Sequence, residues 1–268
     1  MRERLRKWAV VLPVLLAVVP VPAGTDTGFS YDDLDAVLDR HVSDDGLVDY
    51  DSLSVDREPL DRFVDALGRV SADNHPERFD SDEARLAYWM NAYNALMLRR
   101  VVDAWPIASV KKIKPAYGVF WMEKHTLGGE RWTLRGLENK VIRDRFDEPR
   151  IHFGINCASA GCPALPHRAW RAETLGEELD RAARRFVGDP RNVRIDAGRG
   201  EIYLSSIFKW FEEDFTGWLD RREPGRRHDV VEYVLPYLPG ERTAAVDPAS
   251  LKIVWIDYDW AINARVTE

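Results

Sequence analysis

The stretch between residues 81 and 104 most strongly limits how this chain can fold. Its middle, from Leu86 to Leu98, carries apolar or aromatic side chains on nearly every side of a helix. A helix without a polar face is stable only when other elements surround it. Asp80, followed three residues later by Glu83, resembles a capping box and predicts where this helix begins. The sequence therefore predicts one long buried helix near 81–104, with the rest of the fold built around it.

Two asparagines interrupt the apolar middle of this helix. Asn91 and Asn94 are three residues apart and therefore lie on the same side. A buried amide without hydrogen-bond partners costs about 1–3 kcal/mol, so both amides must bond to backbone groups or to a ligand. We favour amides that tie a loop to the helix. The alternative is an active-site role, in which Asn91 assists catalysis and Asn94 binds a ligand.

The other segments indicate a mixture of helices and short strands. Helical patterns cover 31–42, 57–70, 134–146, 174–187, 207–221 and 229–237. Strand patterns cover 151–156 and 252–260, and hairpins are expected over 121–134, with a Gly128-Gly129 turn, and over 192–205. We therefore predict a single α+β domain in which a mainly antiparallel sheet packs with helices.

The N-terminus resembles a secretory signal peptide. Four basic residues within the first seven positions precede an apolar run of about 14 residues, and the small Ala23 follows. The run is shorter than the roughly 20 residues of a membrane span. We therefore expect residues 1–23 to be cleaved and residues 24–44 to form a linker and a helix. The mature protein would be periplasmic or extracellular, without a stable membrane span.

The charge of the chain argues against nucleic acid as a partner. The formal net charge is −7, and loss of the basic leader makes the remaining chain more acidic. Proteins that bind nucleic acid need a basic surface to neutralise phosphates. About 245 residues remain after the leader, which is enough for one domain with a substantial core.

Both cysteines lie in one short segment, 151–165, together with a histidine. A cysteine nucleophile needs a thiolate and a base within reach, and His152 is the nearest histidine to Cys157. In an extended strand these two residues would lie about 16 Å apart and point to opposite faces. A tight turn at Asn156 would have to bring them together. His125 or His167 is the alternative base.

A disulfide between Cys157 and Cys162 is the competing interpretation. An even number of cysteines in an oxidising compartment favours pairing. A bond that closes so short a loop would contribute about 2–3 kcal/mol at most. A redox-active pair is less favoured, since such pairs usually have two intervening residues and this one has four. The cysteines, with His152 and His125, match no familiar zinc spacing, so we expect neither a metal nor another cofactor.

Five motifs carry a resemblance to a known family. They are, in chain order, 88–96, 152–159, 162–163, 205–215 and 258–263. Their order and residues resemble the family catalogued as domain of unknown function 547, over about residues 45–265. Exported bacterial members of that family also have a leader and one domain. The name of the family records no established activity, so the resemblance implies a fold and a site but no reaction. The motif over 205–215 includes Asp214. Rather than bind a ligand, Asp214 could pair with an arginine such as Arg143.

We therefore expect the functional site to surround Cys157. The expected catalytic residues are Cys157, His152, Glu138 and Asn91, and the expected binding residues are Asn94, Asn156, Ser159, Asp214 and Asp259. The leading hypothesis is a thiol-dependent acyl hydrolase or transferase.

The alternative hypothesis is a binding domain without catalysis, in which Cys157 and Cys162 form a structural disulfide. Such a domain would hold a small molecule, a peptide or an envelope component on an aromatic surface. The tryptophans considered for that surface are Trp121, Trp132, Trp218 and Trp255.

Overall fold

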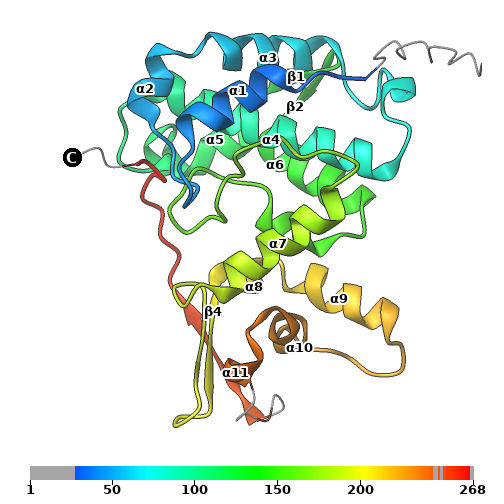
Figure 1. Cartoon of the computed structure of the whole chain (residues 1–268), viewed down its shortest axis with the longest axis vertical. Helices are drawn as coiled ribbons and strands as arrows, with labels where there is room; N and C mark the ends of the chain where they lie inside the picture. The colour runs from blue at the N-terminus through cyan, green and yellow to red at the C-terminus, as the bar shows by residue number, and fades with distance from the viewer. Residues whose placement is uncertain (1–27, 244–246, 248–249, 266–268) are drawn as a thin grey trace, which may run out of the picture.

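The computed structural model of the chain describes residues 28–243, 247 and 250–265 (Figure 1). The expected leader, 1–23, lies outside these residues. The helices are α1 (Asp32–His41), α2 (Tyr50–Val55), α3 (Glu58–Arg69), α4 (Asp82–Ala104), α5 (Gly118–Trp121), α6 (Leu134–Leu137), α7 (Leu175–Gly188), α8 (Ser206–Trp210), α9 (Glu212–Arg222), α10 (Val230–Val234) and α11 (Gly240–Thr243). The strands are β1 (His125–Leu127), β2 (Glu130–Trp132), β3 (Val193–Asp196), β4 (Glu201–Ser205) and β5 (Lys252–Ile256). None of the described helices combines the length and the apolarity that a membrane span requires.

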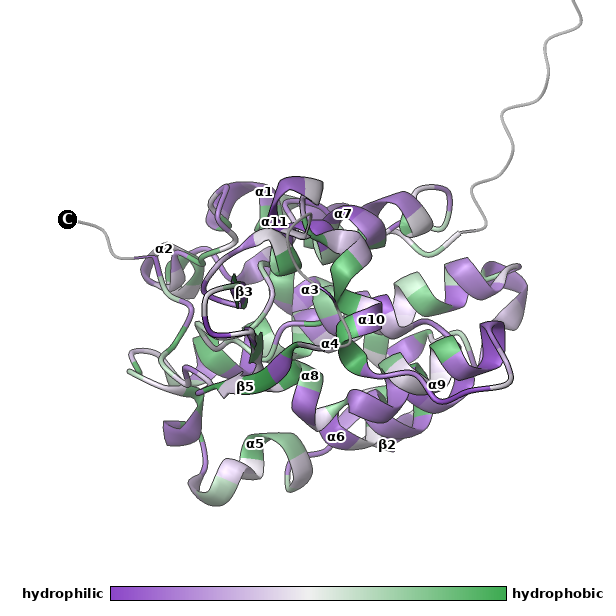
Figure 2. Ribbon diagram, turned by 90° about the horizontal axis from the view of Figure 1, so that it is seen from below, coloured by the Kyte–Doolittle hydropathy of each residue, from purple (hydrophilic) through white to green (hydrophobic). Residues whose placement is uncertain are grey.

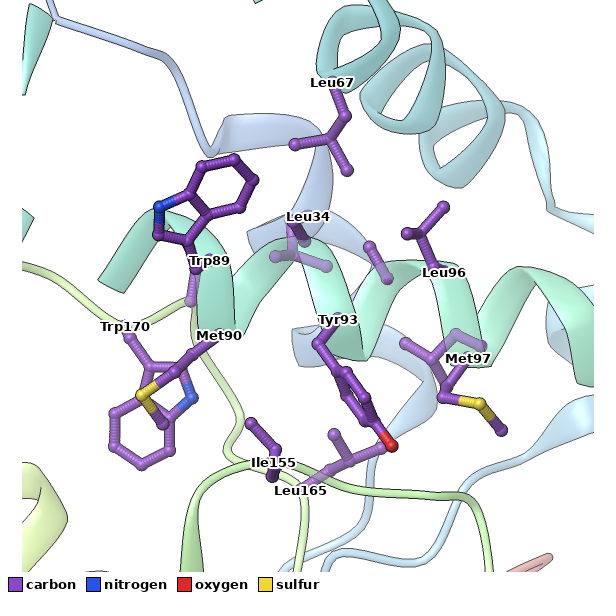
Figure 3. Close-up of a cluster of buried hydrophobic side chains, with 14 of the residues drawn as sticks. Leu34, Leu67, Trp89, Met90, Tyr93, Leu96, Met97, Ile155, Leu165 and Trp170 are labelled. Carbon is purple, nitrogen blue, oxygen red and sulfur yellow. The ribbon is translucent and has the colours of Figure 1, made fainter. Parts of the chain in front are cut away.

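Helix α4 confirms the prediction of a long buried helix. Every residue from Leu86 to Leu98 is buried, because α2 and α3 pack against the helix and loops cover its other side. Figure 3 shows Trp89 projecting to one side of α4, while Met90 and Tyr93 project to the other. The helix begins one residue later than expected, since Ser81 provides the cap and accepts a hydrogen bond from the N–H of Ala84.

The sheets are small and lie in two separate places. Strands β1 and β2 form an antiparallel hairpin, and Gly128 and Gly129 turn it with φ of +55° and +87°, as a two-residue turn requires. Strands β3 and β4 form a second antiparallel hairpin, and β5 joins β4 in parallel. Helices cover both sheets, which confirms the α+β class.

The hydrophobic interior has two parts. The first surrounds α4. The second is rich in phenylalanines, with Phe153, Phe186, Phe208 and Phe215 in mutual ring contact, and lies between α7, α8 and β4. In Figure 2 the hydrophobic segments gather toward the middle of the molecule, whereas α5 lies at its edge with hydrophobic residues.

The strand predicted over 151–156 is wrong. Residues Pro149–Phe153 form a short 3₁₀ helix in which Glu148 accepts a hydrogen bond from the N–H of Arg150. The alternation of apolar residues reflects the two interiors, since Ile151 packs in the first and Phe153 in the second. The intervening His152 is buried as well. The alternation of apolar residues therefore did not correspond to a buried and a solvent-exposed face of a strand.

Candidate functional site

A pocket of about 610 Å³ lies where α4, α5, α8 and the cysteine segment meet the C-terminal residues. Its lining includes Cys157, Cys162, His152 and Glu138. Four residues that the sequence pattern associated with thiol chemistry thus share one cavity. The 3₁₀ helix explains this outcome, because its rise of about 2 Å per residue is much smaller than that of a strand.

The two sulfur atoms lie at disulfide-bonding separation, and the Cα atoms of Cys157 and Cys162 are 6.3 Å apart. Both cysteines are half-buried. The hydroxyl oxygen of Tyr258 lies 3.1 Å from Sγ of Cys157 and 3.0 Å from Sγ of Cys162, and Oγ of Ser159 lies 3.1 Å from Sγ of Cys157. Gly161 permits this approach, since a Cβ there would come within 2.9 Å of the Tyr258 ring. Two hydroxyl groups therefore surround the sulfur of Cys157.

A buried amide holds the turn that carries Cys157. Oδ1 of Asn156 accepts a hydrogen bond of 2.6 Å from the N–H of Ala158, and its Nδ2 donates to the carbonyl of Pro163 at 2.6 Å. Nδ2 of Asn263 also donates to Oδ1 of Asn156, and Oδ1 of Asn263 accepts from the Tyr50 hydroxyl. Asn156 is thus a positioning residue for the cysteine turn and does not line the pocket.

Backbone strain concentrates at the pocket. Within the described residues, Ala116, Tyr117 and Ala158 are the non-glycine residues with positive φ, at +52°, +57° and +63°. Ala116 and Tyr117 line the pocket, and Ala158 directly follows Cys157. Left-handed backbone costs roughly 1–2 kcal/mol for such residues and persists where the surrounding structure enforces it, as happens often at functional sites.

A histidine and an arginine share one carboxylate beside the cysteines. Nε2 of His152 lies 2.6 Å from Oδ2 of Asp214, and Arg143 donates to both oxygens of that carboxylate at 2.6 and 2.9 Å. Asp214 thus pairs with Arg143, the alternative that the sequence left open beside a binding role. The His152 ring stacks on Phe211 at a centroid distance of 4.0 Å. Asp214 therefore fixes the position and orientation of His152.

The pKa values of this pair favour a neutral ring and a charged carboxylate. Burial lowers the pKa of His152 against the opposing effect of Asp214. Burial alone would raise the pKa of Asp214, but hydrogen bonds from His152 and Arg143 outweigh it and hold that pKa well below its usual range. With Nε2–H donating to Asp214, Nδ1 of the neutral ring is the nitrogen that can accept a proton.

Glu138 is an acidic residue that lines the pocket. It begins a π-helical turn, Glu138–Arg143, that directly follows α6, and the hydroxyl of Tyr93 on α4 lies 3.3 Å from its Oε2. Burial raises the pKa of Glu138 to about 7, against the lowering effect of Arg143. This carboxyl can therefore give or take a proton near neutral pH.

Aromatic rings form the mouth of the pocket. Tyr117, Trp121 and Trp210 line it while 39%, 50% and 47% exposed. Trp260 packs on Tyr117 and on Tyr258, with centroid distances of 4.9 and 4.6 Å. Trp121 was expected at a binding surface. The other candidates do not line the pocket: Trp132 packs against the first interior, and Trp218 and Trp255 pack against the second.

The amides of α4 bond to the backbone of two loops. Nδ2 of Asn91 donates to the carbonyl of Trp170 and its Oδ1 accepts from the N–H of Trp170, both at 2.9 Å. Nδ2 of Asn94 donates to the carbonyl of Gly154, and its Oδ1 accepts from the N–H of Asn156. Neither side chain lines the pocket. The structure gives both amides the loop-tying role that we favoured.

Several other predicted residues do not line the cavity. The side chain of Asp259 accepts a hydrogen bond from the N–H of Ala261, and its carbonyl accepts from Gly161. His167 is paired with Asp44 at 3.3 Å, and His125 lies beside a different hollow. His152 is thus the histidine that shares the pocket with Cys157 in the described part of the chain. That part also contains no group of three or more His, Cys, Asp or Glu residues arranged to hold a metal ion.

Several pocket residues were not identified from the sequence as site residues. Arg135, Tyr93, Trp210 and Tyr258 are far apart in the chain and meet only in the fold. Tyr93, Trp210 and Tyr258 stand within motifs of the family resemblance, and this was the available signal.

Comparison with known proteins bears on this site. Residues 76–187 match the family described as "Protein of unknown function, DUF547". This match supports the assignment of the segment to the DUF547 family. No curated protein and no solved structure matches the chain. The DUF547 segment supplies α4, Glu138, His152 and both cysteines, while Asp214 and Tyr258 come from residues beyond it. The wider limits of 45–265 stay a prediction.

Proposed function

We propose that the pocket is the active site of a thiol-dependent acyl hydrolase or transferase, with Cys157 as its nucleophile. One observation carries the proposal: Cys157 lines the same cavity as His152, which Asp214 orients, and as the protonatable Glu138. Nucleophile, base and orienting carboxylate are the groups that cysteine acyl chemistry needs. The family match names no activity, so the chemistry rests on this geometry.

The proposed reaction starts from the reduced cysteine pair. Nδ1 of His152 takes the Sγ proton of Cys157, and the thiolate attacks the acyl carbon of the substrate. The bond from that carbon to the leaving group breaks, and the leaving group departs with a proton from His152 or Glu138. Water or an acceptor nucleophile then cleaves the thioester and restores the thiol. The hydroxyl of Tyr258, 3.1 Å from Sγ, is placed to stabilise the thiolate by hydrogen bonding.

The first experiment measures labelling of Cys157 by iodoacetamide. The protein carries Cys162→Ser, is reduced beforehand, and is labelled between pH 5 and 9. We expect fast labelling with a midpoint well below the free-thiol pKa of about 8.5. Reduced wild type is then screened with p-nitrophenyl acyl esters, with Cys157→Ser as the inactive control. A midpoint at or above 8.5, or labelling only after unfolding, would contradict the proposal.

Asp214→Asn tests whether His152 acts as the base. The substitution removes the carboxylate that fixes the ring, so we expect the midpoint of labelling to move up toward that of a free thiol while the fold, measured by circular dichroism, persists. Arg221→Gln is a matched control, because Arg221 lies on the same helix as Asp214 but pairs with the exposed Asp147.

A binding domain with a structural disulfide is the second candidate. The sulfur positions favour it, and so does the exposed aromatic mouth. In that case Cys157 of the unreduced protein stays unlabelled, and the double variant Cys157→Ser with Cys162→Ser keeps its affinity for a ligand. Loss of ligand binding in this double variant would argue against a purely structural pair.

We also propose that the mature chain works outside the cytoplasm, in the periplasm or the medium. The basic and apolar leader pattern of residues 1–23 supports this. Expression of the full chain with a C-terminal tag, followed by N-terminal sequencing of the exported product, tests it. A product that retains residue 1 and stays in the cytoplasm would overturn it.

A further inference from the structure

We propose that Arg135 binds a carboxylate of the ligand, and that the aromatic mouth takes a flat or apolar group of the same molecule. The inference rests on the proposed function for the identity of the pocket as the active site. It adds a substrate class: acyl compounds that carry a free carboxylate beside an aromatic or apolar group.

The charges that line the pocket support this assignment. Two arginines, Arg135 and Arg143, face a single carboxyl, Glu138. Arg143 is already bound to both oxygens of Asp214. Arg135 is exposed, and among the described residues no carboxylate forms an ion pair with it. The pocket thus presents an available guanidinium in a chain whose net charge is −7.

The protonation of Glu138 strengthens the argument. A carboxyl whose pKa is about 7 is neutral in much of the protein at neutral pH and below. At pH 7 Glu138 therefore offsets only part of the positive charge of Arg135, and it offsets less as the pH falls. A guanidinium presents two parallel N–H groups that match the two oxygens of a carboxylate.

The mouth provides the second half of the binding site. Trp121, Trp210 and Tyr117 expose large parts of their rings next to the cavity. Nζ of Lys111 lies 5.3 Å from the centroid of Tyr117 and 4.9 Å from that of Trp260, which adds a cation at the same rim. Exposed rings beside cations suit a flat anionic molecule, because stacking and charge attraction act together.

Two alkylating probes test Arg135 without knowledge of the natural substrate. Iodoacetate carries a carboxylate and iodoacetamide is neutral, and both react with Cys157 in the reduced Cys162→Ser background. We expect Arg135→Gln to lower the iodoacetate rate about tenfold and to leave the iodoacetamide rate within about twofold. Lys140→Gln is the matched control, since Lys140 is an exposed cation that follows Arg135 closely in the chain and does not line the pocket. It should change neither rate.

A binding measurement tests the role of Arg135 even if Cys157 does not react with the alkylating agents. N-acetylphenylalanine and its amide are titrated into the oxidised protein, and binding is followed by tryptophan fluorescence. We expect a preference for the free acid of about tenfold that Arg135→Gln abolishes, while Trp210→Ala weakens both ligands. Benzyl phosphate is a third ligand, and a clear preference for it would replace a carboxylate with a phosphate as the partner of Arg135 and overturn the proposal.

The outcomes separate this inference from the proposed function. Slow labelling of Cys157 together with a carboxylate preference that depends on Arg135 would remove the catalytic proposal and keep this one. Fast labelling with equal effects of Arg135→Gln on both alkylating agents, and no preference for the free acid, would overturn this inference and keep the nucleophile.

Discussion

Two groups of polar side chains around helix α4 act in opposite ways. The amides of Asn91 and Asn94 bond at both ends to backbone groups of neighbouring loops. The hydroxyl of Tyr93, by contrast, meets Glu138 in the wall of the pocket, where the carboxyl has a raised pKa and Arg135 lines the same wall without an ion pair among the described residues. Satisfied amides hold a fold in place, whereas groups with unused capacity can act on a ligand. The contrast separates structural from functional residues better than burial does.

The largest loss of stability is expected at the amides that bond to the loops. Asn94→Ala leaves the buried carbonyl of Gly154 and the buried N–H of Asn156 without their partner. Each unpaired group costs about 1–3 kcal/mol, so we expect the free energy of unfolding to fall by about 2–5 kcal/mol. Urea denaturation measures it. A loss below about 1 kcal/mol would show that the amide does not hold the cysteine turn.

Glu138→Gln should have the next largest effect, and its sign depends on pH. The pKa of Glu138 is about 7 in the folded protein and about 4.5 in the unfolded chain. The folded state therefore binds this proton more tightly, and the resulting stability is complete below pH 4.5 and is lost as the pH rises through 7.

Glutamine cannot lose that proton. We therefore expect the variant to match wild type near pH 4 and to exceed it at pH 8, by up to about 3 kcal/mol in the free energy of unfolding. Denaturation curves at both pH values give the difference between the two proteins. A difference that does not change with pH would contradict a raised pKa at this site.

Reduction of the cysteine pair should have a smaller effect. The bond between Cys157 and Cys162 closes a loop with four intervening residues, so its loss should lower the free energy of unfolding by about 2 kcal/mol or less. Unfolding with and without a reducing agent measures this, and the double serine variant shows whether the agent acts elsewhere. Unfolding on reduction alone would mean that the pair is essential to the domain.

Asn139→Ala should change stability least, and it sharpens the comparison with Asn94. Asn139 lines the pocket, and its Oδ1 accepts one hydrogen bond from Arg143, which Asp214 also holds. Water can replace this contact, so we expect a loss below about 1 kcal/mol in the same urea experiment. Equal losses at Asn94 and Asn139 would remove the distinction between the loop-tying amides and the pocket residues.

Local patterns predicted much of the fold. The all-round apolar middle of 81–104 predicted a buried helix, and Gly128-Gly129 predicted a hairpin turn, because both signals depend on neighbouring residues alone. The segment 151–156 was misassigned, since its alternation came from two separate interiors that the sequence does not reveal. The helix expected over 207–221 is likewise divided at Phe211.

The sequence by itself determined the class of the fold, the burial of α4 and the presence of both cysteines and a histidine in one segment. Tertiary structure decided which residues join Cys157. His152 reaches the pocket because its segment is a compact 3₁₀ helix, and Tyr258 meets both sulfur atoms from about 100 positions further along the chain. Long-range packing sets the distances between these residues. The composition and the spacing of residues do not predict which loops will contact one another.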